Sequence, residues 1–168
     1  MKSALSGVVV LALAVALQSA IIRQITLLQG SADLVLLTLA AWYMHEEAPG
    51  SWVWAVIAGL MVGTLSALPW WLYVVGYGGL AAVALFLRRR LWQTSYFAYF
   101  FLILVGCALT LGLSWAYLRF VAGAGIPLAP TLNRVFFPSL LLDVLFALPV
   151  YSLMDEWAAW FFAEEPAL

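Results

Sequence analysis

The sequence predicts an all-α membrane protein, a polytopic bundle of about six transmembrane helices. Hydrophobic residues make up 67% of the 168 residues and charged residues only 9%, so a soluble fold would lack the charged surface that it needs. The apolar residues also form long runs, most of them close to the roughly 20 residues that cross the hydrocarbon core as a helix. We therefore expect lipid to be the solvent of the outer surface.

Six apolar runs are candidate spans of one transmembrane domain, residues 1–154. The runs are residues 4–22, 32–44, 52–68, 70–87, 96–118 and 135–154. The first run follows Lys2 and has some features of a signal peptide, but it is long and residues 18–20 make a poor cleavage site, so we expect it to be retained as a span. The second is short, and a thin span, a tilted half-membrane helix and a re-entrant segment all fit it.

The connections between the runs predict the remaining architecture. Pro69 alone separates the third run from the fourth, which predicts a tight helical hairpin because proline fits the first turn of a helix. Residues 119–134 contain two glycines and two prolines, and we expect them to form a loop outside the bilayer. Residues 155–168 alternate acidic and aromatic residues, which predicts a short helix lying on the membrane surface.

Basic residues and tryptophans indicate orientation. With six spans the two termini share a side with Lys2 and with the basic cluster Arg88, Arg89 and Arg90. Because short cytoplasmic loops are enriched in Lys and Arg, we place that side in the cytoplasm. The cluster is either a plain topology determinant or a contact for anionic lipid or a cytoplasmic partner. The nine tryptophans lie mostly near the ends of the runs, which is typical of an interfacial aromatic belt.

Several function classes lack their usual residues. A net charge of -1 argues against a nucleic-acid binder. Cys107 and His45 are the only cysteine and histidine, so the parts of a disulfide, a zinc site or a catalytic triad are missing. Gly76, Gly78 and Gly79 follow no strand and precede no Lys-Ser/Thr pair, so we expect them to permit close packing or a kink. We expect no catalytic residue, metal or cofactor.

Polar residues near or within the spans are the candidate functional residues, since burying them in a membrane is costly. Asp33 is interpreted as the N-cap of the second span, with an ion pair to Arg23 as the alternative. Asp143 lies near the middle of the sixth span, with Asn133 and Arg134 at its mouth. A proton relay would need a second acid facing Asp143, and none is evident, so we favour a hydrogen-bonding anchor between helices.

Small residues recur at four-residue spacing in two spans. Such spacing lets another helix approach closely, either within the bundle or from a partner protein. Internal packing is the default interpretation, and a partner's helix is the functional one. The residues are Gly59, Gly63 and Ala67 in the third span, and Gly106, Thr110 and Ser114 in the fifth.

Four features together resemble the MreD family, the small membrane subunits of the bacterial cell-elongation machinery. The short second span opens with Ser-Ala-Asp-Leu at residues 31–34, and the hairpin of residues 59–77 leads to the basic cluster. A long fifth span precedes a Gly/Pro loop. The last span contains Asp143, Pro149 and Tyr151 in an order similar to the family's Asn…Pro-x-Tyr ending.

The resemblance implies a non-enzymatic scaffold in the bacterial cytoplasmic membrane. Proteins of this family associate with the bitopic protein MreC, and together they connect the MreB filament to the peptidoglycan synthase formed by RodA and its penicillin-binding partner. Their fold is similar to that of the S-components of energy-coupling-factor vitamin transporters. The alternative function is therefore a transport subunit that binds a small vitamin in a pocket beneath residues 119–134.

Overall fold

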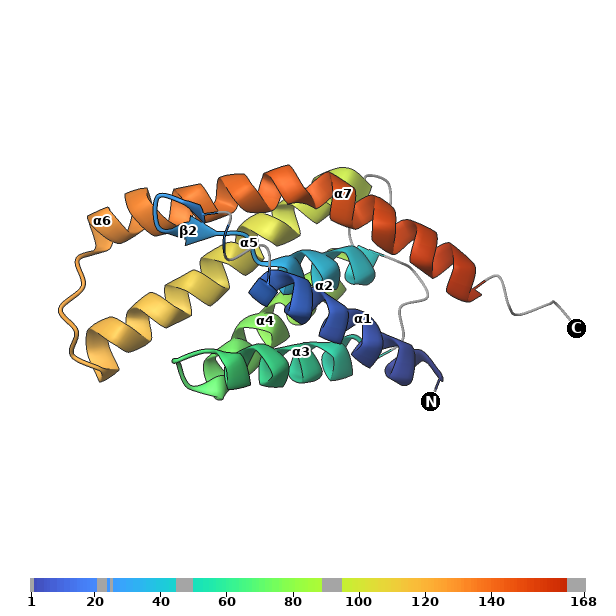
Figure 1. Ribbon diagram of the computed structural model, residues 1–168, viewed down its shortest axis with the longest axis horizontal. Helices are drawn as coiled ribbons and strands as arrows, with labels where there is room; N and C mark the ends of the chain where they lie inside the picture. The colour runs from blue at the N-terminus through green and yellow to red at the C-terminus, as the bar shows by residue number, and fades with distance from the viewer. Residues whose placement is uncertain (1, 21–23, 25, 45–49, 89–94, 163–168) are drawn as a thin grey trace, which may run out of the picture.

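The computed structural model describes residues 2–20, 24, 26–44, 50–88 and 95–162. Over these residues the chain is nearly all helical, which confirms the predicted fold class (Figure 1). The main helices are α1 (Lys2–Ala20), α2 (Leu34–Met44), α3 (Ser51–Leu65), α4 (Trp70–Arg88), α5 (Ser95–Ala116) and α7 (Phe137–Phe162). The shorter elements are β1 (Thr26–Leu27), β2 (Gly30–Ser31), η2 (Tyr117–Val121), α6 (Leu128–Thr131) and η3 (Leu132–Phe136).

Three helical segments in the described part of the chain are long and apolar enough to cross a membrane: Trp70–Leu87, Phe97–Val121 and Leu128–Ala159. Large apolar side chains are exposed along them, including Phe86, Phe97 and Leu145. A surface of this kind is stable against lipid and unstable against water. The chain is a helical membrane protein.

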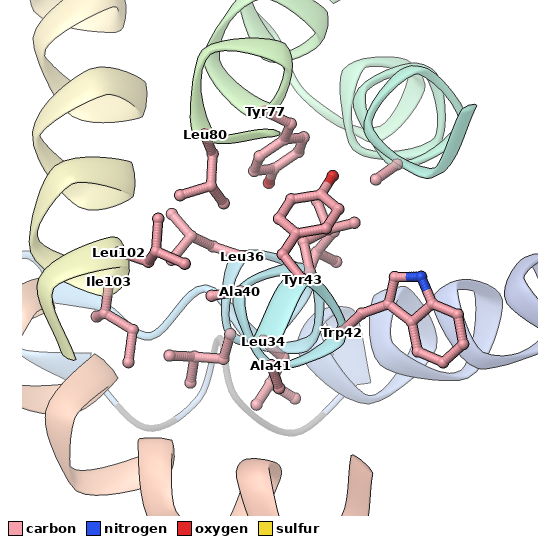
Figure 2. Close-up of a cluster of buried hydrophobic side chains, with 14 of the residues drawn as sticks. Leu34, Leu36, Ala40, Ala41, Trp42, Tyr43, Tyr77, Leu80, Leu102 and Ile103 are labelled. Atoms are coloured by element: carbon pink, nitrogen blue, oxygen red, sulfur yellow. The ribbon is translucent and has the colours of Figure 1, made fainter. Parts of the chain in front are cut away.

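The short second helix, α2, is the centre of the bundle. Ten of its 11 residues are buried, and it packs against α1, α4, α5 and α7. Figure 2 shows its side chains meeting Tyr77 and Leu80 of α4 and Leu102 and Ile103 of α5. Eleven residues rise roughly 16 Å, well short of a hydrocarbon core about 30 Å thick. This length favours a half-membrane or re-entrant helix over a thin full span, and α2 is a core helix surrounded by longer ones.

The predicted hairpin of α3 and α4 is confirmed, and glycines make it tight. A Cβ on Gly59 would lie 2.6 Å from the Cα of Val74, and one on Gly63 would lie 2.6 Å from the Cα of Trp70. Only residues without a side chain allow the two backbones to come this close. The hairpin therefore depends on glycine at both positions.

The connection between the fifth and sixth spans is shorter than predicted. The loop expected over residues 119–134 is wrong, because η2 extends α5 to Val121 and a continuous helical run begins again at Leu128. Gly123 and Gly125 adopt left-handed conformations with φ of 64° and 63°, which end a helix at little steric cost. Pro130 lies in the first turn of α6, where its missing N–H costs nothing.

The predicted C-terminal tail begins within α7. Residues 155–162 are helical, as expected for the tail, and they continue α7 without interruption to Phe162; their place at the membrane surface stays a prediction. Residues 163–168 of the predicted tail lie outside the described residues. The α7 helix tolerates Pro149 in its interior, as membrane helices do where neighbouring groups satisfy the freed carbonyl.

A β-hairpin that the sequence analysis missed joins α1 to α2. Its strands β1 and β2 pair antiparallel, with Thr26 opposite Ser31. The Gln29 N–H donates to the carbonyl of Arg134 (3.0 Å), and a Cβ on Gly30 would lie 2.5 Å from the Ser139 nitrogen. The hairpin is therefore packed directly on η3 and the start of α7.

The aromatic-belt interpretation is wrong for part of the tryptophans. Trp42 and Trp54 are buried and stack with ring centroids 4.4 Å apart, and the ring of Trp157 lies 5.4 Å from that of Trp42. These three join α2, α3 and α7 inside the protein, where large aromatic surfaces stabilise packing. Trp52, Trp70 and Trp71 are exposed, as residues of a belt would be.

Candidate functional site

The start of α2 is held by side chains from two other helices. Oδ1 of Asp33 accepts from the Leu36 N–H (3.1 Å) and its Oδ2 accepts from the Tyr77 hydroxyl (2.9 Å). The Gln18 side-chain oxygen, from α1, accepts from the Val35 N–H (3.1 Å). These bonds satisfy donors that the first turn of a helix leaves unpaired. The predicted N-cap is present, and Arg23, its alternative partner, lies outside the described residues.

Asp143 meets the same region from α7. Its side chain is 1% exposed, and its Oδ1 accepts from the backbone N–H of Asp33 (2.7 Å). One turn earlier, the Ser139 hydroxyl accepts from the Ser31 N–H (3.1 Å). Asp143 is thus a hydrogen-bonding anchor between two elements. The second acid that was not evident in the sequence is Asp33, 110 positions away, whose backbone N–H is the donor.

A polar cavity, here called the inner chamber, lies beside this pair of acids. Its volume is about 170 Å³. Asp33 and Asp143 line it together with the hydroxyl residues Ser31, Thr110 and Ser139. The chamber lies between the β-hairpin, α5 and α7, at the point where α2 begins. It would hold several waters or a few non-hydrogen atoms of a solute.

A second cavity, the outer chamber, adjoins the first and has a volume of about 330 Å³. Its lining residues come from the C-terminal part of α5, from η2, and from the run of α6 and η3. Its lining is mostly apolar and includes Trp115, Leu118 and Phe136, with Arg134 as its one lining residue of basic type. Asn133, the other predicted residue at this mouth, is exposed and does not line either chamber.

The small residues predicted for partner docking mainly serve contacts within the bundle. Gly59 and Gly63 face α4, and Ala67 lies beyond the end of α3. A Cβ on Gly106 would lie 2.9 Å from Leu36 of α2. Thr110 is buried against Gly76. The default interpretation of internal packing therefore holds for these helices, and Gly76 permits close packing as expected.

Ser114 continues this face of α5 toward the chambers. It donates from its hydroxyl to the Thr110 carbonyl (2.7 Å), and it lines both chambers. A hydroxyl that bonds to its own helix needs no further donor partner, so Ser114 fits an apolar environment as well as a polar one.

An apolar groove runs between α1 and α7, with α2 as its floor, and is here called the α1–α7 groove. Its volume is about 380 Å³. Its walls include Leu13 and Leu17 of α1 and Leu153 of α7, which are 62%, 42% and 66% exposed. On the floor of the groove, the Thr38 hydroxyl donates to the Leu34 carbonyl (2.7 Å). Sequence reasoning missed this groove because neither helix carries a small-residue motif there.

The remaining candidate residues are placed as follows. Arg88 ends α4, while Arg89, Arg90 and His45 lie outside the described residues. Cys107 is buried and free. No group of three or more potential metal ligands occurs among the described residues.

Comparison of the chain with protein-family models, with curated proteins and with solved structures finds no match.

Proposed function

We propose that this chain is a non-enzymatic scaffold of the MreD type in the bacterial cytoplasmic membrane. It binds the single transmembrane helix of an MreC-like bitopic partner. Through that partner it takes part in cell elongation with RodA, its penicillin-binding partner and MreB. The sequence resemblance supports the identity of the complex. The α1–α7 groove is the observation that supports helix binding.

The groove suits a transmembrane helix in shape and chemistry. Two helices form its walls and a third its floor, so an added helix would pack against three neighbours at once. The described residues that line it are apolar apart from Thr38, whose hydroxyl is already bonded. Within a membrane, helices associate through such close van der Waals packing, because burial from lipid alone supplies little driving force.

Cysteine cross-linking tests the site as well as the partner. The tagged chain is purified in mild detergent with its bound proteins, which are identified by mass spectrometry. Cys107 is then replaced (Cys107→Ser) so that Leu13→Cys and Leu153→Cys each carry a single thiol, and the partner carries single cysteines along its helix. We expect disulfide cross-links from both groove positions.

Phe97→Cys is the matched control, because Phe97 is 79% exposed on α5 and does not line the groove. Cross-links from Phe97→Cys with none from the groove positions would move the docking site to another face. Recovery of no bitopic protein from native membranes would reject the scaffold proposal.

The second candidate is the S-component type of transport subunit, and the two adjoining chambers favour it. A ligand-binding subunit needs a concave site with a few polar groups, and the inner chamber provides both. The same purification separates the two functions. Recovery of an ATPase-coupled transporter module in place of a bitopic protein would support substrate capture.

A further inference from the structure

The two chambers adjoin and share part of their lining. Four residues line both of them: Gln29, Leu111, Ser114 and Val135. The inner chamber of about 170 Å³ is too small for most organic ligands, whereas joining it to the outer chamber of about 330 Å³ reaches the range of roughly 300–1,000 Å³ typical of small-molecule sites. An occupant would therefore extend through both.

The inner chamber is suited to positive charge. Two carboxyl groups line it, and none of the described residues that line it is basic. Asp143 is almost completely buried, and an ionised carboxylate at such a position is costly unless a cation or strong donors compensate it. The Asp33 N–H supplies one donor to Asp143. A cationic group in the chamber would complete the compensation.

The outer chamber is suited to an apolar group. Leu118, Ile126 and Phe136 contribute apolar surface. Trp115 adds aromatic surface to the same lining. Arg134 at this end repels a cation, so the charged end of an occupant would point inward.

We infer that the joined chambers bind a small organic cation, with its ammonium head beside Asp33 and Asp143 and its apolar body against Trp115 and Phe136. This inference does not depend on the proposed scaffold function, since the groove and the chambers share no described lining residue. A scaffold with such a site would respond to a solute, and a transport subunit with such a site would carry one.

Calorimetric titration of the purified full-length protein in detergent tests the charge preference. The probe is 2-phenylethylamine, which has an ammonium head and an aromatic body. The neutral isostere 2-phenylethanol and the anion 3-phenylpropionate are the matched controls. We expect the amine to bind at least about tenfold more tightly than either control, because one buried charge pair commonly contributes more than the 1.4 kcal/mol that this ratio requires. Equal binding of the amine and the alcohol, or no binding of the amine, would overturn the inference.

Two variants locate the binding. Asp143→Asn keeps an acceptor for the Asp33 N–H and removes the charge, so amine affinity should fall at least about tenfold. Asp155→Asn, at an exposed position of the same helix outside both chambers, should leave it unchanged. Ser114→Leu adds bulk where the two chambers share their lining and keeps both carboxyl groups, so it should abolish binding even if Asp143→Asn does not fold. Unchanged affinity in Ser114→Leu would contradict the inference.

Discussion

At the scale of single residues, Asp33 has three bonding roles at the start of α2. It caps α2, accepts from Tyr77, and donates through its backbone to Asp143. Asp33→Ala removes the first two bonds and leaves the Tyr77 hydroxyl buried without its acceptor. Loss of a cap costs about 1 kcal/mol and a buried unsatisfied group about 1–3 kcal/mol, so we expect a loss of stability of about 2–4 kcal/mol. Thermal unfolding in detergent measures it.

Two companion variants make that measurement specific. Asp33→Asn keeps an acceptor and should lose less stability than Asp33→Ala. Asp155→Ala, at an exposed site on α7, should stay within about 0.5 kcal/mol of the parent, as surface substitutions usually do. If Asp33→Ala matched Asp155→Ala, the network around α2 would have no energetic role.

The same residues mark how far sequence reasoning reaches at this scale. Asp33 directly before an apolar run is a local cap signal, and the cap was predicted from it. The bond between Asp33 and Asp143 joins positions 110 apart, and no local pattern encodes such a distance. The available signal was that two acids, Asp33 and Asp143, lie within apolar runs. Each buried carboxylate needs a partner.

At the scale of elements, the α3–α4 hairpin offers a matched pair of glycine substitutions. Gly59→Ala places a Cβ 2.6 Å from the Val74 backbone, so the helices must separate, and such overpacking costs about 1–3 kcal/mol. Gly112→Ala on α5 meets nothing within 4 Å and should be neutral or stabilising by up to about 1 kcal/mol, because alanine favours helix. Thermal unfolding of both variants in detergent checks the difference. Equal destabilisation would show that the close approach is not required.

The helices predicted from long apolar runs are present, whereas the predicted positions of some helix ends are wrong. Proline and glycine over residues 119–134 suggested a long loop, but Pro130 sits in a first turn where proline is acceptable, so only residues 122–127 connect the helices. Strands β1 and β2 have two residues each, too few for an alternating pattern. The two strands are stabilised by their packing on α7 and not by a local sequence preference for strand.

At the scale of the whole molecule, composition was sufficient for the fold class and insufficient for the arrangement. Because the chain has few charged residues, its outer surface must be largely apolar. The central position of α2 follows from its tertiary contacts, although a helix apolar on all sides hints at burial. The buried stack of Trp42 and Trp54 also follows from tertiary contacts. A tryptophan near the end of an apolar run can lie at the membrane interface or in the core, and the sequence pattern is the same in both cases.

The overall arrangement makes a prediction about topology. The N-terminal end of α1 and the C-terminal end of α7 lie at one end of the molecule, and the loop of residues 122–127 lies at the other (Figure 1). From Leu128 to Glu156 a continuous helical run rises roughly 42 Å, which exceeds a hydrocarbon core of about 30 Å. The loop and Glu156 must then lie on opposite sides of the membrane. From Lys2 and the basic cluster that begins at Arg88 we predict that the Glu156 side is cytoplasmic.

Labelling of single cysteines in the Cys107→Ser background tests this orientation. Ala124 and Glu156 are both exposed, so Ala124→Cys and Glu156→Cys report on the two ends. A membrane-impermeant maleimide should label Ala124→Cys in intact cells and Glu156→Cys only after permeabilisation. The reverse pattern would contradict the predicted orientation and place the end of the molecule that carries the loop on the cytoplasmic side. Identical labelling of the two positions would be inconsistent with a run that crosses the bilayer, because both ends of a 42 Å helical run cannot share one face when it spans a core of about 30 Å.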